Sequence, residues 1–430
     1  MNATNHVKRE CQDFFDYVCK NNTLIGSDNG NIESIFAKPS NSGETHQSEL
    51  VKSEENMIMK FFTKTNKEKS RTLKLPKTEA PNSLDFSAFN QTHADITLLN
   101  NTLIRLFSKP RNHFHDSKYK NNVRMSIVQI LQSYSFNVEI QTFSFPRKFI
   151  WNAKNVIGIM PSPNYEKPHD RIVVIGGHYD TLEGVPGVDD NGSGSVFVLE
   201  AARLLSKYKK QLNATIYFIL FDEEEMGLEG SIAFVDDYLV PKVLNAKKGQ
   251  FFGAYIADML LLFDDEPNSQ SVEPGLKYLC PDAYEWMSNN SFRGDFISVV
   301  SRDADLFLWK IFKESWDEID ENRYKTMLIK APLAANYYSM QLENKGSFFR
   351  SDHASFWTAA RSNDHIDTLP AVVLTDLGPW RGYQRKCYHQ PCDNTIQLTE
   401  TNLKFLAKTI DSTVGSVLKI AKIKETTESV

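Results

Sequence analysis

The chain has 430 residues, of which 24% are charged, and its formal net charge at pH 7 is -5. This slightly acidic balance excludes the strongly basic surface that nucleic-acid binding requires, and no apolar run approaches the roughly 18 residues of a membrane-spanning helix. The length is sufficient for one large α/β domain with a sizeable core and an accessory segment.

Residues 1–92 are predicted to form an N-terminal extension that is accessory or poorly structured. Their apolar periodicity is weak, and residues 29–43 are dense in Asn, Ser, Gly and Pro. The segment between Cys11 and Cys19 resembles the first part of neprilysin-type ectodomains. Because no His-Glu-x-x-His motif occurs in the sequence, this short resemblance does not imply neprilysin chemistry.

Glycosylation sequons favour a secreted or extracellular protein. Asn-x-Ser/Thr sequons begin at Asn2, Asn21, Asn90, Asn100, Asn213 and Asn289. No signal peptide is visible, since a basic region followed by an apolar one is absent from the N-terminus. Five cysteines allow at most two disulfides, and Cys387 and Cys392 are close enough in sequence to form one in an oxidising compartment.

A catalytic domain is predicted from residue 93 to residue 420, with a short tail at 421–430. Apolar residues recur at helical spacing between Leu98 and Leu106, and again between Val123 and Leu131. Residues 136–143 alternate in polarity like an edge strand, and residues 155–160 are the next strand.

Two apolar runs, at 171–177 and 214–221, are predicted to be neighbouring parallel strands. A helical pattern lies between them and would return the chain for the second strand. The first run leads into His178-Tyr-Asp180, the loop after it contains Asp189-Asp190, and the second run leads into the acidic residues 222–225. Loops at the carboxyl ends of parallel strands converge, so we expect these side chains to be neighbours.

These residue types indicate a metal site. Imidazole and carboxylate ligands without thiolates suit zinc, and a carboxylate placed between two ligand-bearing strands can bridge two ions. Taken alone, residues 222–225 would more often be a solvated surface, and Asp189-Asp190 could be a simple turn. The position of the acidic run directly after a strongly apolar strand favours the functional interpretation, and a two-metal hydrolase is the first hypothesis.

Three motifs then resemble, in order and spacing, the signatures of the M28 zinc exopeptidases. They are His178-Tyr-Asp180, the segment 186–194 and the segment 224–231. This family comprises dizinc aminopeptidases, glutamate carboxypeptidases and glutaminyl cyclases. The resemblance covers roughly residues 93–418. It implies an α/β fold with a mixed, largely parallel sheet flanked by helices on both faces.

The resemblance also assigns the later segments. Residues 252–258 are predicted as a buried strand ending in Asp258, which matches the family's third ligand position, although an isolated aspartate there would more often cap a loop. Residues 387–393 resemble the family's Tyr-His-x-x-x-Asp signature, which makes His389 the last ligand. Further strands are expected at 295–301 and 369–376, helices at 231–237, 303–312 and 398–418, and an insertion at 361–367.

The ligand set implied by the resemblance holds two Zn2+ per chain. His178 and Asp258 would hold one ion, and Glu225 and His389 the other. Asp190 would bridge the two ions. The choice of Asp190 over its neighbour Asp189 rests on the register of the family motif.

Three catalytic roles are also implied by the resemblance. Glu224 would be the general base. Tyr388 would donate a hydrogen bond to the developing oxyanion. Asp180 would orient the ring of His178. Asp352 and His353 belong to a Ser-Asp-His segment that recurs in the family, and both are assigned to structural support or to the lining of the substrate site.

The expected function is an exopeptidase acting on peptides, most simply an aminopeptidase. One alternative is a glutaminyl-peptide cyclotransferase with a single zinc. A second is a carboxypeptidase acting on acidic C-termini, for which the candidate residues are Arg350, Arg361, Arg381 and Arg385. A third is a non-catalytic ectodomain of the transferrin-receptor type. Such proteins usually lose ligands, and every family ligand is present in this chain.

Overall fold

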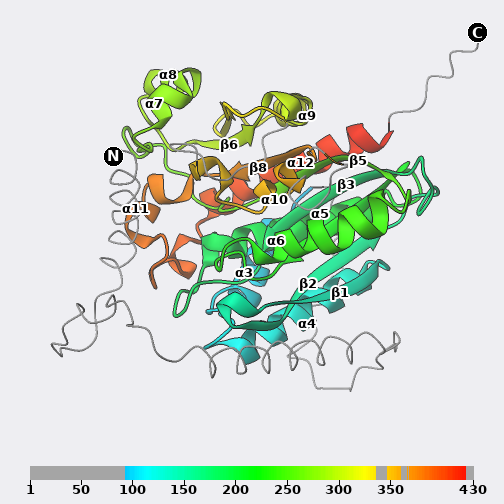
Figure 1. Ribbon diagram of the computed structural model, residues 1–430. Helices are drawn as coiled ribbons and strands as arrows, with labels where there is room; N and C mark the ends of the chain where they lie inside the picture. The colour runs from blue at the N-terminus through cyan, green and yellow to red at the C-terminus, as the bar shows by residue number, and fades with distance from the viewer. Residues whose placement is uncertain (1–92, 336–345, 360–365, 367, 423–430) are drawn as a thin grey trace, which may run out of the picture. The chain divides into compact units, whose positions relative to one another are not determined.

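The computed structural model describes residues 93–335, 346–359, 366 and 368–422 (Figure 1). The predicted N-terminal extension with Cys11 and Cys19, most of the predicted insertion and residues 423–430 of the tail lie outside the described residues. The sequons at Asn2, Asn21 and Asn90 lie outside them too. Among the described residues, no helix has the length and apolar character needed to cross a bilayer.

The core of the described chain is an eight-stranded sheet with the strand order β1-β2-β4-β3-β5-β8-β6-β7. Strands β3, β4, β5 and β8 run parallel to one another, and so do β6 and β7; the pairs β1–β2, β2–β4 and β8–β6 are antiparallel. The strands are β1 (Asn137–Phe145), β2 (Ile150–Met160), β3 (Arg171–His178), β4 (Ala214–Phe221), β5 (Gln250–Ala257), β6 (Phe296–Ser301), β7 (Lys325–Lys330) and β8 (Ala371–Thr375).

Helices cover both faces of this sheet. One hydrophobic cluster joins the sheet to α3 (Ile96–Leu106), α4 (Ser117–Ser133), α5 (Gly194–Ser206), α9 (Leu306–Asp317) and α12 (Glu400–Lys422). The other joins it to α6 (Glu229–Phe234), α8 (Pro281–Asn289) and α10 (His353–Trp357). Val173 and Ile175 of β3 face the first cluster, and Ile172 and Val174 face the second. Burial on both faces explains why the central strands are almost continuously apolar.

The predicted fold class is confirmed, and most of the predicted elements are present. The run at 136–143 is the edge strand β1, and the two runs around the metal motifs are the parallel strands β3 and β4. Sequence analysis did not identify β7 or α8. Strand β6 runs antiparallel to β8, so the sheet is mixed, as predicted.

Candidate metal centre

The candidate ligands meet because three parallel strands end at one edge of the sheet. His178 is the last residue of β3 and is paired with Phe221, the last residue of β4. Asp258 directly follows β5, and Glu224 and Glu225 lie in the turn after β4. His389 reaches the same place from the turn that follows α11 (Gln384–Cys387).

Their side chains form two groups of three with ligand atoms close enough to hold a cation. His178, Glu224 and Asp258 form one group, and Asp190, Glu225 and His389 form the other; within each group the ligand atoms lie within 4.8 Å of one another. Both predicted histidines and all four predicted carboxylates of the centre are therefore brought together.

Asp190 connects the two groups. Its Oδ1 atom lies 3.5 Å from Nε2 of His178, and its Oδ2 atom lies 3.3 Å from Nε2 of His389. The two oxygens of one carboxylate therefore face histidines that belong to different groups. This is the arrangement that a carboxylate bridging two metal ions requires.

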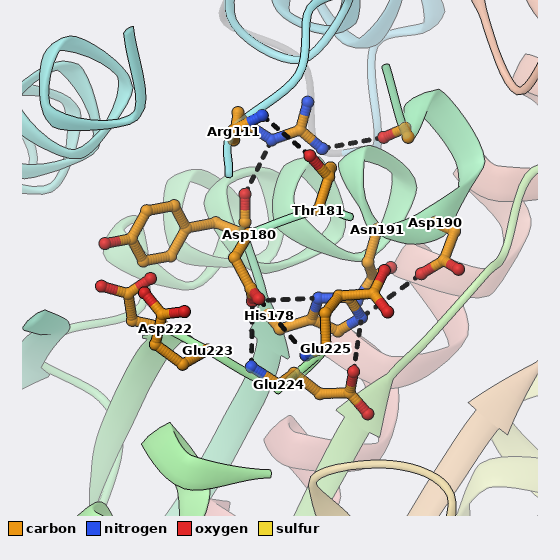
Figure 2. A network of polar contacts seen from close by, with 12 residues as sticks. Arg111, His178, Asp180, Thr181, Asp190, Asn191, Asp222, Glu223, Glu224 and Glu225 are labelled. Carbon is orange, nitrogen blue, oxygen red and sulfur yellow. Dashed lines mark hydrogen bonds and ion pairs between the residues drawn. The ribbon is translucent and has the colours of Figure 1, made fainter. Parts of the chain in front are cut away.

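The surroundings of His178 fit a cation. The ring is buried, and its Nε2 atom makes no hydrogen bond within the described part of the chain. A carboxylate oxygen of Glu224 lies 3.9 Å from this nitrogen (Figure 2). A carboxylate oxygen of Asp258 lies 3.7 Å from it. Burial by itself would lower the pKa of His178, but Glu224 and the neighbouring aspartates raise the pKa well above its usual value.

The carboxylates of the centre carry more negative charge than the two histidines can balance. Burial, reinforced by Asp190, raises the pKa of Glu225 to about 8. Burial also raises the pKa of Glu224 well above its usual range, and Glu225 and Asp258 add to this effect. Because buried carboxylates without a partner are costly, two divalent cations would relieve this excess.

The loop that carries Asp190 is anchored on two sides. The carboxylate of Asp393 accepts hydrogen bonds of 3.0 Å from the backbone N–H groups of Asp189 and Asp190. The side chain of Asn191 donates to the carbonyl of Ala257 at the end of β5. A Cβ atom on Gly194 would lie 2.6 Å from that carbonyl oxygen, so glycine is needed where α5 begins against the loop.

Asp189 points away from the candidate ligands. Its Oδ1 atom accepts a hydrogen bond from the backbone N–H of Leu261, and its Oδ2 atom accepts one from the side chain of Gln384. Both carboxylate oxygens of Asp189 are therefore engaged in hydrogen bonds that hold neighbouring segments together. The geometry therefore favours Asp190 over Asp189 as the residue facing the histidines.

Asp180 lies beside Nδ1 of His178 and connects this ring to the acidic turn. Its Oδ1 atom lies 3.4 Å from Nδ1 of His178 and accepts a hydrogen bond from the N–H of Glu224. Its Oδ2 atom accepts one from the N–H of Glu225 (Figure 2). One carboxylate thus fixes both the imidazole and the backbone of the two glutamates.

Tyr388 stacks on His389, with ring centroids 3.7 Å apart and planes inclined by 22°. Burial raises the pKa of Tyr388 well above its usual value, and four carboxylates of the centre, led by Asp190, act in the same direction. Its hydroxyl therefore stays protonated and can donate. The disulfide predicted between Cys387 and Cys392 is present and encloses this segment.

Asp352 and His353 have different surroundings, although both were assigned to support or lining. Asp352 is fully buried, and neither of its side-chain oxygens has a hydrogen-bond partner among the described residues. Burial raises its pKa to about 7, with His178 opposing the shift and Asp258 adding to it. Nε2 of His353 lies 2.9 Å from the carbonyl oxygen of Phe348.

Arg111, which was not predicted from the sequence, holds the loops around the centre. This guanidinium is fully buried and donates to five backbone carbonyl groups, those of Phe107, Lys109, Tyr179, Pro186 and Gly187. Figure 2 shows it above Asp180 and Thr181. No motif surrounds Arg111 in the sequence. All of its acceptors are backbone atoms, so the residue types of its partners could not indicate its role.

Comparison with known proteins is consistent with this centre. Residues 155–256 match the sequence profile of the family described as Peptidase family M28. The aminopeptidase YwaD of Bacillus subtilis (strain 168) is 39% identical over 99 residues, which are 23% of this chain and 21% of YwaD. The chain therefore matches only about a fifth of that relative's length. The resemblance predicted from the motifs is confirmed, and the chain carries the sequence signature of the M28 metallopeptidases.

Solved structures confirm the fold. An aminopeptidase from Aneurinibacillus sp. strain AM-1 matches with a TM-score of 0.51 and 16% identity, over 76% of this chain and 94% of that chain. A glutaminyl cyclase from Porphyromonas gingivalis matches with a TM-score of 0.50 and 15% identity, over 76% of this chain and 99% of that chain. Because an aminopeptidase and a cyclase share the fold, the fold alone does not choose between the two activities.

Proposed function

We propose that this chain, a member of peptidase family M28, is a dizinc exopeptidase that releases amino acids from the amino end of peptides. The observation that carries the proposal is the position of Asp190, whose two oxygens face His178 and His389 in separate ligand groups. A single ion would not need a carboxylate shared in this way.

The residues divide naturally between two ions. His178 and Asp258 would hold one, Glu225 and His389 the other, and Asp190 both. Asp190 Oδ1 lies closer to Nε2 of His178 than Glu224 Oε2 does, at 3.5 against 3.9 Å, which leaves Glu224 free for another role. When bound, the zinc ions would polarise the scissile carbonyl and lower the pKa of the attacking water.

The chain's own groups would move the proton and stabilise charge. Glu224 would accept the proton of the attacking water and pass it to the leaving amine. Tyr388, which is kept protonated by its surroundings, would donate a hydrogen bond to the oxyanion. Asp180 would hold the ring of His178 and, through the two backbone N–H groups, the orientation of Glu224.

The single-zinc cyclase is the second candidate, supported by the structural likeness to a glutaminyl cyclase. A one-zinc centre built on Asp190, Glu225 and His389 would leave His178 and Asp258 without a cation between them. Buried imidazole and carboxylate groups without partners are costly, so the two-zinc centre is favoured. The number of bound zinc ions separates these two possibilities.

Whether residues are removed from the amino or the carboxyl end depends on which free end of the peptide the site binds. For a carboxypeptidase of acidic C-termini, Arg381 is a poor candidate, because it is fully buried and donates to Gln270 and to the carbonyls of Leu262 and Phe296. We expect amino acids to be released from C-terminally amidated peptides and not from N-terminally acetylated ones. Release only from the acetylated peptides would establish the opposite direction, and release from neither would contradict an exopeptidase.

We also propose that the protein is secreted. The disulfide between Cys387 and Cys392 supports an oxidising compartment, where such bonds persist. Asn213 and Asn289, which open two of the sequons, are both exposed. Expression of the full-length protein with and without an inhibitor of the secretory pathway, followed by measurement of its amount in the medium, tests this proposal.

A further inference from the structure

The acidic run after β4 divides into two pairs of residues that face opposite ways. Glu224 and Glu225 lie beside the ring of His178, whereas Asp222 and Glu223 extend away from it (Figure 2). The metal centre accounts for the first pair. Asp222 and Glu223 are each about 1% exposed, so they are buried acids with no part in the proposed chemistry.

A lysine and a histidine from another part of the chain contact these two acids. Lys120, on α4, has a side chain only 4% exposed, and its Nζ atom lies 2.5 Å from Asp222 Oδ1 and also contacts Glu223 Oε1. Nδ1 of His113 lies 2.8 Å from the same oxygen of Glu223. The Glu223 carboxylate is thus held between two basic groups that precede β1 in the chain.

Glu223 adopts a backbone conformation that its residue type disfavours. Its φ angle is +60°, in the left-handed region that glycine adopts readily and residues with a Cβ adopt rarely. The carbonyl of Glu223 accepts a hydrogen bond from the N–H of Glu229, and the carbonyl of Glu224 accepts from Gly227 and Leu228. The direction of Glu224 and Glu225 therefore depends on a left-handed residue immediately before them.

We propose that Lys120, assisted by His113, is a positioning residue that holds Glu223 in this left-handed turn and so aims Glu224 and Glu225 into the metal centre. Asp180 fixes the backbone N–H groups of the two glutamates from one side, and Lys120 fixes the preceding side chains from the other. The turn is thereby clamped at both ends. The inference rests on the proposed function for its catalytic consequence, but its effect on metal binding is independent of the substrate.

Substitution of Lys120 should lower the zinc affinity of the centre, although Lys120 is not itself a proposed ligand. For Lys120→Met we expect roughly 10- to 100-fold lower zinc affinity, as is typical when a group that orients ligands is lost, together with a lower kcat. Zinc affinity is measured by competition with a chelator, and kcat with a peptide substrate. The melting temperature is measured on the same samples, so that unfolded protein is not counted as a loss of affinity.

Substitution of Glu223 by glycine or alanine distinguishes two roles of Lys120, which could position the turn or only balance charge. Both Glu223→Gly and Glu223→Ala remove the carboxylate, but only glycine adopts a positive φ angle without cost. In the Lys120→Met background, we expect Glu223→Gly to restore zinc affinity to within about threefold of the wild type and Glu223→Ala to leave it low. Equal rescue by both residues would show that Lys120 only balances charge and would overturn the proposal, as would unchanged affinity in Lys120→Met.

The same comparison with Lys120 intact keeps the test decisive if Lys120→Met does not fold. Glu223→Gly should then keep wild-type zinc affinity, and Glu223→Ala should lower it. Identical affinities for these two variants would overturn the proposal. If the wild type cleaves no peptide, the proposed function fails, while the zinc affinities of this series still decide whether the turn is positioned as inferred.

Discussion

Asp393 accepts, through its Oδ2 atom, a hydrogen bond of 3.0 Å from the backbone N–H of Asp190, although 203 residues separate the two. Asp393 lies four residues after His389, and Asp190 faces that histidine. The segment that supplies the last candidate ligand therefore also fixes the loop that carries the bridging one. This hydrogen bond therefore links the two halves of the centre.

This relationship predicts that Asp393→Ala weakens zinc binding without removing any ligand. The N–H groups of Asp189 and Asp190 would lose their acceptor, and the loop would be free to turn Asp190 away. We expect roughly 10- to 100-fold lower zinc affinity, measured by competition with a chelator. Asp303→Ala, which removes an exposed aspartate paired with Lys330, is the matched control. Equal affinity in the two variants would contradict the role given to Asp393.

Removal of the proposed base should separate metal binding from turnover. Glu224→Gln keeps the size of the side chain but cannot accept a proton from water. We expect about two bound zinc ions and a kcat lower by roughly two to four orders of magnitude. Glu285→Gln, at an exposed position on α8, is the control and should keep full activity. Near wild-type turnover in Glu224→Gln would remove Glu224 from its role.

The sequence located most of the candidate site because its ligands follow strands. His178 and Asp258 come at the ends of apolar runs predicted as buried strands, and parallel pairing brings such ends together. Asp189 and Asp190 could not be separated by composition, since both are aspartates in one loop. Their different roles follow from Leu261, Gln384 and the two histidines, which lie far away in the sequence.

The groups that support the ligands and one part of the sheet could not be predicted from the sequence. Lys120 lies in a polar stretch of α4 that resembles a solvent-exposed helix face, and only its distant acidic partners explain its burial. Strand β7 contains only three consecutive apolar residues, 327–329, between Lys325 and Lys330, so its pattern does not stand out in the sequence. The reversal of β6 against β8 depends on long-range pairing that local patterns do not encode.

The number of zinc ions decides between the peptidase and the cyclase. With the bridging geometry of Asp190, the fully loaded wild type should contain two zinc ions per chain, measured by elemental analysis. His178→Ala removes a ligand of one ion only, so we expect a lower zinc content and loss of peptide hydrolysis. One zinc in active wild-type protein, together with an active His178→Ala variant, would exclude the dinuclear centre and favour the cyclase.

The disulfide around His389 should stabilise the protein and its last ligand. Cys387 and Cys392 close a small ring, and chain entropy for a ring of this size corresponds to about 2 kcal/mol. The double variant Cys387→Ser/Cys392→Ser should lose roughly this free energy of unfolding and bind zinc more weakly, because the segment carrying His389 becomes freer. Unfolding by urea and chelator competition measure the two effects. A double variant as stable as the wild type would contradict the prediction.

The buried imidazole of His353 should make the folded protein sensitive to acid. Burial lowers the pKa of His353 to about 3, although the carbonyl of Phe348 opposes the shift. In the unfolded chain the pKa returns to about 6.5, so between these two values the unfolded chain binds more protons than the folded chain. The contribution of His353 to stability is therefore complete above about pH 6.5 and falls as the pH decreases, by roughly 3 to 5 kcal/mol near pH 3.

The variant His353→Gln tests this prediction, because glutamine can still donate to the carbonyl of Phe348 but does not titrate. We expect the free energy of unfolding of the wild type to fall more steeply than that of His353→Gln between about pH 7 and pH 4. His169→Gln is the control, since His169 is exposed and should give the wild-type slope. Unfolding in urea at a series of pH values measures all three slopes. Parallel curves for the wild type and His353→Gln would mean that His353 binds its proton equally in the folded and unfolded chains.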